Sequence, residues 1–189
     1  MATRQGQTDP RVVRSRERVL EAALAELADR GFGGFSIDGV AKRAGVARST
    51  IYRLGHDRVS LVAKAMETLN VQPRPDAGGL DPRADVVAIV AHLASAMQSS
   101  LMSDCLPAVL DGAERDPGLR ELHHSYSTQR RTRLVDALIR LRESGQAVGD
   151  PERAAEALAG AVFYRRLMTP SPLRTDEVEG LVATVLGSD

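Results

Sequence analysis

Residues 36 to 54 constrain the fold of this chain most, because they spell two short helices joined by a tight turn. Ser36 is suited to cap a first helix, along which apolar residues recur at positions 37, 40, 41 and 44. Gly45 follows where a left-handed backbone is needed, and glycine adopts it readily because it has no Cβ. The segment therefore predicts a helix-turn-helix.

The second helix of this pair is amphipathic, and its polar side indicates what it contacts. Its apolar side consists of Val46, Ile51 and Leu54. The opposite side presents guanidinium and hydroxyl groups, from Arg48, Ser49, Tyr52 and Arg53. A short helix with such a face fits the major groove of DNA.

The charge distribution supports a nucleic-acid partner, although the formal net charge is zero. Residues 1–64 hold 12 Lys and Arg against 7 Asp and Glu, so this segment carries +5 and the remainder −5. A basic end on an acidic body predicts that one end faces phosphate. A solvated charged face is the simpler alternative.

Composition favours an all-α fold. Aromatic residues make up only 3% of the chain, tryptophan is absent, and no stretch shows strand periodicity. No run reaches the ~20 apolar residues of a membrane span, and the N-terminus lacks the apolar core of a secretory signal. Cys105 is the only cysteine, which excludes an intrachain disulfide. We therefore expect a cytoplasmic protein with no membrane partner.

Proline and glycine punctuate the chain into about nine predicted helices. A helix capped by Asp9 is expected to end at Gly31, and Pro107 is expected to be tolerated only in the first turn of its helix. The expected ranges are 10–30, the two helices of the motif, 57–69, 83–99, 103–115, 117–143, 151–167 and 175–186, with a loop at 71–82. We expect a DNA-binding domain over 1–57, a connecting helix and loop over 58–82, and a helical domain for ligand binding and dimerisation over 83–189.

Residues 18–66 resemble the DNA-binding domain of TetR-family transcriptional repressors. The matching landmarks are Ala22, Ala23, Gly31-Phe32, Ser36-Ile37, Ala41, Ala44-Gly45-Val46, Ile51-Tyr52 and Arg58. The stretch Leu158–Leu167 is similar to the eighth helix of one subgroup of that family. The chain departs from the pattern at Gly55, where the family usually has a large aromatic residue. Losing that ring costs about 3–5 kcal/mol unless Leu54 or Phe35 fills the space.

The resemblance implies a homodimer whose recognition helices enter successive major grooves of a palindromic operator. It implies base-edge contacts from Arg48 and Ser49, because arginine pairs bidentately with guanine. The implied phosphate contacts are Ser36, Thr50, Tyr52, Arg53 and Arg58. Packing of Tyr52 against the fourth helix is the alternative for that residue. Lys42 and Arg43 are expected on a solvated face, and His56 in a loop at a helix start.

The resemblance also implies a small-molecule effector bound by the C-terminal part. The candidate pocket residues are His92, Leu93, Met97, Cys105, Leu122, Tyr126 and Phe163. Ordinary core packing of these side chains is the competing interpretation. The implied dimer interface uses the last two helices, through Ala154, Ala157, Leu158, Ala161, Val178, Leu181, Val182 and Val185. Packing within one chain would use the same residues.

We expect no metal site, no cofactor and no enzyme activity. The adjacent His123 and His124 face different sides of a helix, and the sequence has no phosphate loop, paired carboxylates or nucleophile–base spacing. The predicted function is a DNA-binding repressor released from its operator by a ligand. The alternative is a small-molecule-binding or interaction protein whose helix-turn-helix no longer reads DNA, with Gly55 as its cause.

Overall fold

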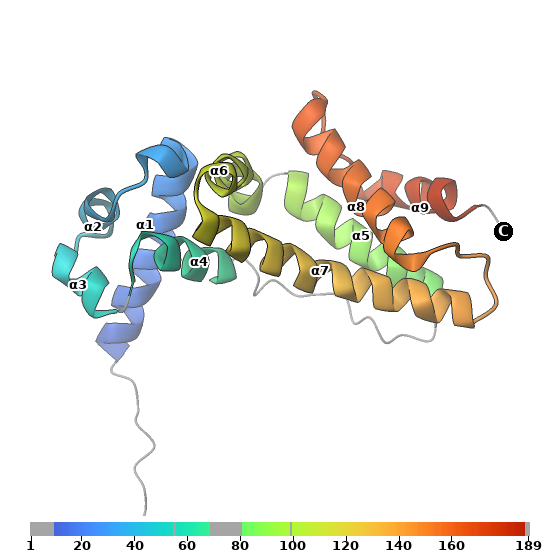
Figure 1. Cartoon of the computed structure of the whole chain (residues 1–189), viewed down its shortest axis with the longest axis horizontal. Helices are drawn as coiled ribbons and strands as arrows, with labels where there is room; N and C mark the ends of the chain where they lie inside the picture. Colours follow the sequence, from blue (N-terminus) through green and yellow to red (C-terminus); the bar gives the residue numbers. More distant parts are fainter. Residues whose placement is uncertain (1–9, 55, 69–80, 99, 188–189) are drawn as a thin grey trace, which may run out of the picture. The chain divides into compact units, whose positions relative to one another are not determined.

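The computed structural model describes residues 10–54, 56–68, 81–98 and 100–187, and these are helical with no strand (Figure 1). The described elements are α1 (Pro10–Gly34), α2 (Ile37–Ala44), α3 (Arg48–Arg53), α4 (Arg58–Thr68), α5 (Pro82–Gln98), α6 (Leu101–Arg115), α7 (Pro117–Glu143), α8 (Pro151–Met168), the 3-10 turn η2 (Thr175–Glu177) and α9 (Val178–Leu186). The predicted all-α fold is confirmed. The expected cap at Asp9 and the loop at 71–80 lie outside the described residues. None of the described helices is by itself long and apolar enough to cross a membrane.

The chain forms two compact units that do not follow its linear order. The N-terminal unit combines the described residues before 72 with residues 104–122, and the C-terminal unit contains the remainder. Residues 104–122 were expected with the C-terminal part. They group with the N-terminal unit because Cys105 Sγ donates to the Leu24 carbonyl at 3.5 Å and Gly112 lies directly against Phe32.

The N-terminal unit is built on α1, which packs closely against α2 and α4. Val19, Ala23 and Leu27 are at most 1% exposed and form the inward side of α1. Gly31 interrupts the helix with φ 64° and ψ 171°, values that favour glycine. The predicted end of the regular helix at Gly31 is therefore confirmed, with a further turn to Gly34.

The C-terminal unit packs α5, α8 and α9 against one another. Its innermost side chains are completely buried and repeat at helical spacing, at Val86, Val90 and Ala94 of α5, Ala155, Leu158 and Val162 of α8, and Val178 and Val182 of α9. This periodic burial accounts for how three mostly apolar helices form one core.

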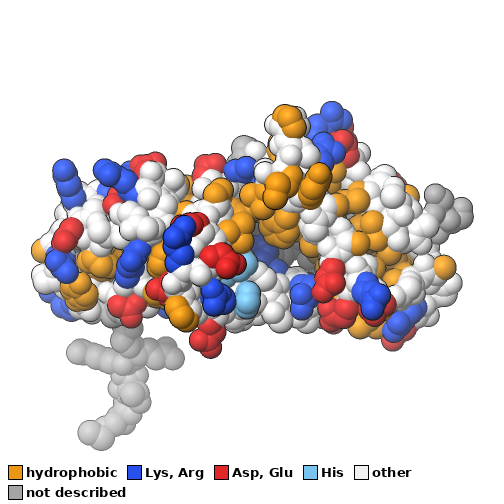
Figure 2. All heavy atoms as spheres, turned by 45° about the horizontal axis from the view of Figure 1, so that its top comes forward, with side chains coloured by type: hydrophobic (Ala, Val, Ile, Leu, Met, Phe, Trp, Pro, Cys, Tyr) orange, Lys and Arg blue, Asp and Glu red, His pale blue; other side chains and the backbone are white. Residues whose placement is uncertain are grey.

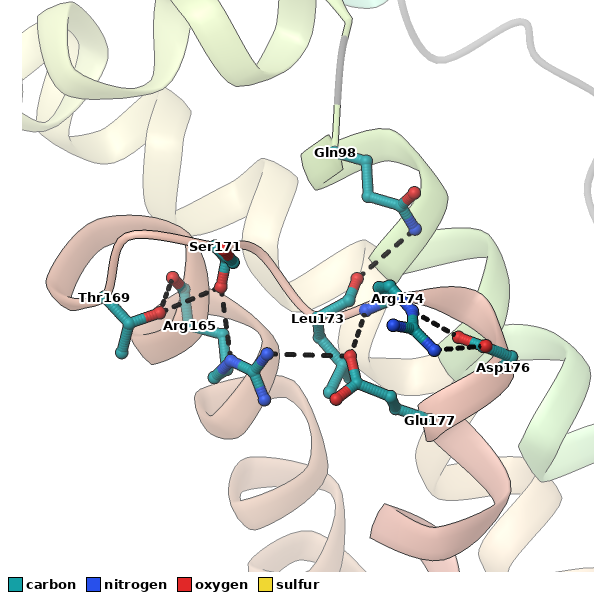
Figure 3. A network of polar contacts seen from close by, with 8 residues as sticks. All are labelled: Gln98, Arg165, Thr169, Ser171, Leu173, Arg174, Asp176 and Glu177. Atoms are coloured by element: carbon teal, nitrogen blue, oxygen red, sulfur yellow. Dashed lines mark hydrogen bonds and ion pairs between the residues drawn. The ribbon is translucent and has the colours of Figure 1, made fainter.

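A polar network holds the connection between α8 and α9 (Figure 3). Arg165 forms an ion pair with Glu177 at 3.5 Å, and its Nε donates to the Ser171 carbonyl at 3.2 Å. Gln98 of α5 donates to the Leu173 carbonyl at 3.3 Å. These bonds satisfy carbonyls of the loop and fix where η2 and α9 begin.

Pro107 lies deeper in its helix than the sequence predicts. Because α6 begins at Leu101, Pro107 falls in the second turn and cannot donate to the Ser103 carbonyl four residues earlier. Arg166 of α8 supplies the missing donor, since its Nη2 donates to that carbonyl at 3.0 Å and its Nε donates to Ser103 Oγ. Ser103 is 2% exposed, so water does not readily replace this donor.

Replacing Arg166 with methionine should therefore lower the free energy of unfolding by about 1–3 kcal/mol, the cost of a buried acceptor left unpaired. The same change should cost less in a Pro107→Ala background, because an alanine at this position regains the N–H that pairs with the Ser103 carbonyl. Denaturant unfolding of the four proteins of this double-mutant cycle measures the difference. The exposed Arg153→Met is the control, and additive effects of the two changes would contradict the pairing.

Candidate nucleic-acid interface

The α2–turn–α3 segment has the backbone geometry of a helix-turn-helix (Figure 1). Ser36 caps α2 in an extended conformation, and its Oγ accepts from the Gly39 N–H at 3.0 Å. Gly45 ends the helix in the left-handed region, with φ 66° and ψ 37°. The Val46 N–H then donates back to the Ala41 carbonyl at 3.0 Å. The predicted start, stop and turn of α2 are all confirmed.

Charged groups anchor α2 to α1. Glu26 of α1 is only 7% exposed, and a Cβ on Gly39 would collide with its carboxylate. Arg43 Nη2 lies 3.3 Å from Glu26 Oε2 and 2.7 Å from Asp29 Oδ2. Arg43 was expected on a merely solvated face, but it neutralises a buried carboxylate and holds α2 in place.

The polar side of α3 faces solvent. Ile51 is completely buried, whereas Tyr52 is 49% exposed, so Tyr52 does not pack into the core. The other exposed residues of this helix are Arg48, Ser49 and Arg53, while Thr50 is half-buried. The structure therefore leaves the predicted contact residues of α3 accessible to a partner.

Arg48 is held in a defined position on this face. Its Nη2 donates to the Tyr52 hydroxyl at 3.0 Å, and its Nη1 lies 3.2 Å from Asp38 Oδ2. The guanidinium carbon is also 5.5 Å from the centre of the Tyr52 ring. The hydrogen bond to Tyr52, and then the charge of Asp38, raise the pKa of Arg48. Restricting a long side chain in this way reduces the entropy it loses on binding.

Two further cations stand out near α3. Lys42 and Arg53 are exposed, and neither forms an ion pair with any side chain in the described part of the chain. Figure 2 shows Lys and Arg side chains projecting from the visible face of the N-terminal unit, with acidic side chains between them. Unpaired surface cations are the groups that contact phosphates at little desolvation cost.

Arg58 does not have the geometry predicted for a phosphate contact. It is half-buried, its guanidinium carbon lies 4.1 Å from the centre of the Phe32 ring, and its Nη2 donates to the Phe32 carbonyl. These contacts join the start of α4 to the end of α1. The structure thus gives Arg58 a packing role, because a cation–π contact and a backbone acceptor already engage its head group.

His56 is buried, which the sequence analysis missed. It lies in the predicted loop but is only 5% exposed, and its Nε2 has no hydrogen-bond partner among the described residues. Phe35 is 3% exposed and Leu54 half-buried, whereas Gly55 lies outside the described residues. The only available signal was a planar ring next to the position where the family has an aromatic residue.

The burial of His56 predicts acid sensitivity. Burial first, and then the charges of Arg16 and Lys64, lower the pKa of His56 from 6.5. The unfolded chain therefore binds this proton more readily, so stability is full above pH 6.5 and falls as the pH drops toward the folded pKa. His56→Gln should lose less stability than the native protein between pH 7.5 and 5.5 in thermal unfolding. An equal loss would exclude His56 as the cause, and His124→Gln, at an exposed histidine, is the control.

Comparison with known proteins identifies the family. Residues 74–185 match the model "Tetracyclin repressor-like, C-terminal domain", and residues 19–54 match "Bacterial regulatory proteins, tetR family". The chain belongs to the TetR family. It is a DNA-binding transcriptional regulator, as the helix-turn-helix geometry indicates.

Relatives of this TetR-family regulator align over most of its length. The HTH-type transcriptional regulator YdeS of Bacillus subtilis (strain 168) is 25% identical over 181 residues, which cover 92% of this chain and 88% of YdeS. Salmonella enterica GusR has 17% identity and a TM-score of 0.74, covering 96% of this chain and 99% of GusR. AibR, solved with isovaleryl coenzyme A and operator DNA, has 16% identity and a TM-score of 0.72, covering 93% and 100%. These solved structures show that the fold is shared.

The predicted pocket residues of the TetR-family chain are divided between its two units. Cys105 and Leu122 belong to the N-terminal unit, and the other five to the C-terminal unit. Cys105 is completely buried, and burial raises its pKa to about 11, which keeps it a thiol. Met97 is 3% exposed, whereas the remaining members are half-buried: His92, Leu93, Leu122, Tyr126 and Phe163. Among the described residues, no three His, Cys, Asp or Glu side chains form a metal-ligand group.

The predicted dimer residues of the TetR-family chain also separate into two sets. Leu158, Val178 and Val182 are completely buried within the chain, so they contribute to its own core and not to an exposed contact surface. Ala157 is exposed, and the half-buried members are Ala154, Ala161, Leu181 and Val185. Exposed Tyr164 and Met168, which the sequence analysis did not select, continue the spacing of 154, 157 and 161 along α8.

Proposed function

We propose that this TetR-family regulator binds a palindromic operator as a homodimer through α3 and leaves it when a small molecule binds the C-terminal part. The observation that carries the DNA contact is the accessible face of α3, on which Arg48 is positioned by Tyr52 and Asp38. One such helix reads few base pairs, so a two-fold dimer is needed for specificity.

The contacts divide by chemistry. Arg48 and Ser49 near the start of α3 are the base-edge readers, with Arg48 pairing to guanine. Ser36, Thr50, Tyr52 and Arg53 contact phosphates and fix the register without reading sequence. Exposed Lys42 joins this second group. Arg58 leaves it, because its guanidinium is engaged by Phe32.

The dimer forms through α8, which has two apolar sides. One side, Ala155, Leu158 and Val162, is completely buried in the chain's own core. The other presents a second stripe at alternating spacings of three and four, through Ala154, Ala157, Ala161, Tyr164 and Met168. Tyr164 and Met168 are 62% and 72% exposed, and Figure 2 shows hydrophobic side chains at this end of α8. Small residues followed by large exposed ones suit packing against the same helix of a second copy.

Ligand release is supported by the division of labour between the units. The DNA-contacting segment 1–57 precedes the connecting segment 58–82, and the remaining 83–189 supplies the ligand and dimer functions. Residues 104–122 pack with the N-terminal unit, so α6 and α7 each run from one unit into the other. AibR, which has this fold, was solved with both a coenzyme A ester and operator DNA.

Fluorescence-polarisation titration against the intergenic DNA beside its own gene, with a scrambled duplex as control, tests the DNA-binding proposal. We expect preference for the intergenic duplex that persists at physiological salt. Equal binding to both duplexes that disappears by ~0.2 M salt would mean phosphate attraction only. That outcome would instead support an interaction protein with a degenerate helix-turn-helix.

Sedimentation velocity tests the dimer. Ala157→Arg places a charge on the exposed stripe of α8 and should shift the protein to monomers. Glu143→Arg introduces the same side chain on an exposed position of α7 and should leave the dimer intact. A monomeric native protein, or dissociation by both variants, would contradict the proposed interface.

A further inference from the structure

The inward side of α7 is apolar at both ends and polar in the middle. Leu119, Leu134, Leu138 and Leu141 are at most 4% exposed and mark this side of the helix. At the same helical spacing, the half-buried residues between them are His123, Tyr126 and Arg130. All the remaining residues of α7 from 123 to 133 are exposed, so these three form the inward face of that section.

A polar section in an inward stripe is unfavourable for packing alone. Half-burying a guanidinium costs free energy unless it has partners, and leucines continue the same stripe on both sides. Within the C-terminal unit, α5, α8 and α9 approach one another closely, whereas α7 is not packed as tightly against any of them. The polar section therefore faces a side of α7 that no helix backbone of this unit covers closely.

The three side chains have the chemistry to hold an anion. Arg130 Nη1 donates to the Tyr126 hydroxyl at 2.6 Å, and the guanidinium carbon is 5.4 Å from the centre of the tyrosine ring. The Tyr126 hydroxyl is an acceptor in this bond, so its own hydrogen is available to a ligand. Residues 122–135 include three arginines and two histidines but no Asp or Glu. The local field of this section is consequently positive.

We propose that His123, Tyr126 and Arg130 bind the acidic head group of the effector, a small organic anion with an apolar body. Arg130 pairs with the carboxylate or sulfonate, and Tyr126 and His123 donate hydrogen bonds to it. The apolar body lies along the leucines that continue the stripe, beginning with Leu134. This inference rests on the proposed ligand-binding function and specifies the class of ligand. Tyr126 was a predicted pocket residue, whereas Arg130 was not selected from the sequence.

Two fluorescent probes that differ only in charge test this proposal. The anionic probe is 8-anilinonaphthalene-1-sulfonate, and N-phenyl-1-naphthylamine is the same ring system without the sulfonate. We expect Arg130→Met to weaken binding of the anion about tenfold or more, equivalent to about 1.4 kcal/mol, while affinity for the neutral probe changes little. Arg130→Lys should restore most of the anion affinity, because it restores the charge.

Arg133→Met is the matched control, since Arg133 is exposed three residues further along α7. It should leave both probes unaffected. Equal weakening by Arg130→Met and Arg133→Met, or equal loss of the two probes in Arg130→Met, would overturn the assignment. Unchanged affinity of Arg130→Met for the anion would overturn it as well. These titrations contain no DNA, so they fail independently of the operator-binding experiment.

Discussion

Replacing Arg48 with alanine should lower affinity for the operator by about tenfold to a hundredfold and leave affinity for random duplex nearly unchanged, as expected for loss of one bidentate base contact. The physical reason is that Tyr52 and Asp38 already hold the guanidinium on the exposed face of α3. The native protein therefore loses little side-chain freedom when Arg48 meets a guanine, and alanine removes the whole contact.

Arg53→Ala is the matched comparison, because Arg53 is exposed on the same short helix and forms no ion pair with the described residues. It should weaken both duplexes alike and reduce the slope of log affinity against log salt by about one. Polarisation titrations of both variants across a salt series separate the two roles. If Arg48→Ala weakens operator and random duplex equally, Arg48 is a phosphate contact and does not read sequence.

Local signals were sufficient to predict most of the helices. Ser36 and Gly45 act on the backbone within a few residues, and the structure shows the cap and the left-handed residue where the sequence placed them. Gly31 likewise breaks α1 at the expected position. Such signals are readable because the hydrogen bonds they make or prevent are short in sequence.

The errors occurred where a partner is distant in the chain. Pro107 is tolerated in the second turn of α6 because Arg166 donates to the carbonyl that the proline leaves unpaired. Arg58 resembled a surface cation, but its partner is Phe32, 26 residues earlier. Arg43 similarly meets Glu26 of α1. No periodicity or spacing identifies such partners, since only the fold brings them together.

The apolar residues of α8 illustrate a different limit. Ala154, Ala155, Ala157 and Leu158 are adjacent and all suit helix packing, so hydrophobic content does not distinguish the chain's own core from a partner's. Burial does distinguish them, because Leu158 is completely buried and Ala157 is exposed. The inward polar section of α7 was likewise invisible until burial showed which side of the helix faces the unit.

Gly112→Ala should destabilise the protein by about 1–3 kcal/mol, the cost of overpacking a filled core. A Cβ at Gly112 would lie 2.5 Å from Leu119 Cδ2 and 2.6 Å from Phe32 Cγ. Phe32 has little freedom to move, because its ring and carbonyl both engage Arg58. In an unobstructed helix interior the same substitution would instead stabilise by about 1 kcal/mol, so the sign of the effect reports the contact.

Denaturant unfolding followed by circular dichroism measures this prediction, and an unchanged m-value shows that the midpoint reports stability. Gly33→Ala is the control in the same unit, because nothing lies within 4 Å of a Cβ built there. It should change stability by no more than about 0.5 kcal/mol. If Gly112→Ala were neutral or stabilising, α6 would have room to move away from Phe32. The close packing of residues 104–122 with the N-terminal unit, on which the proposed link between ligand and DNA depends, would then be too loose to transmit a change.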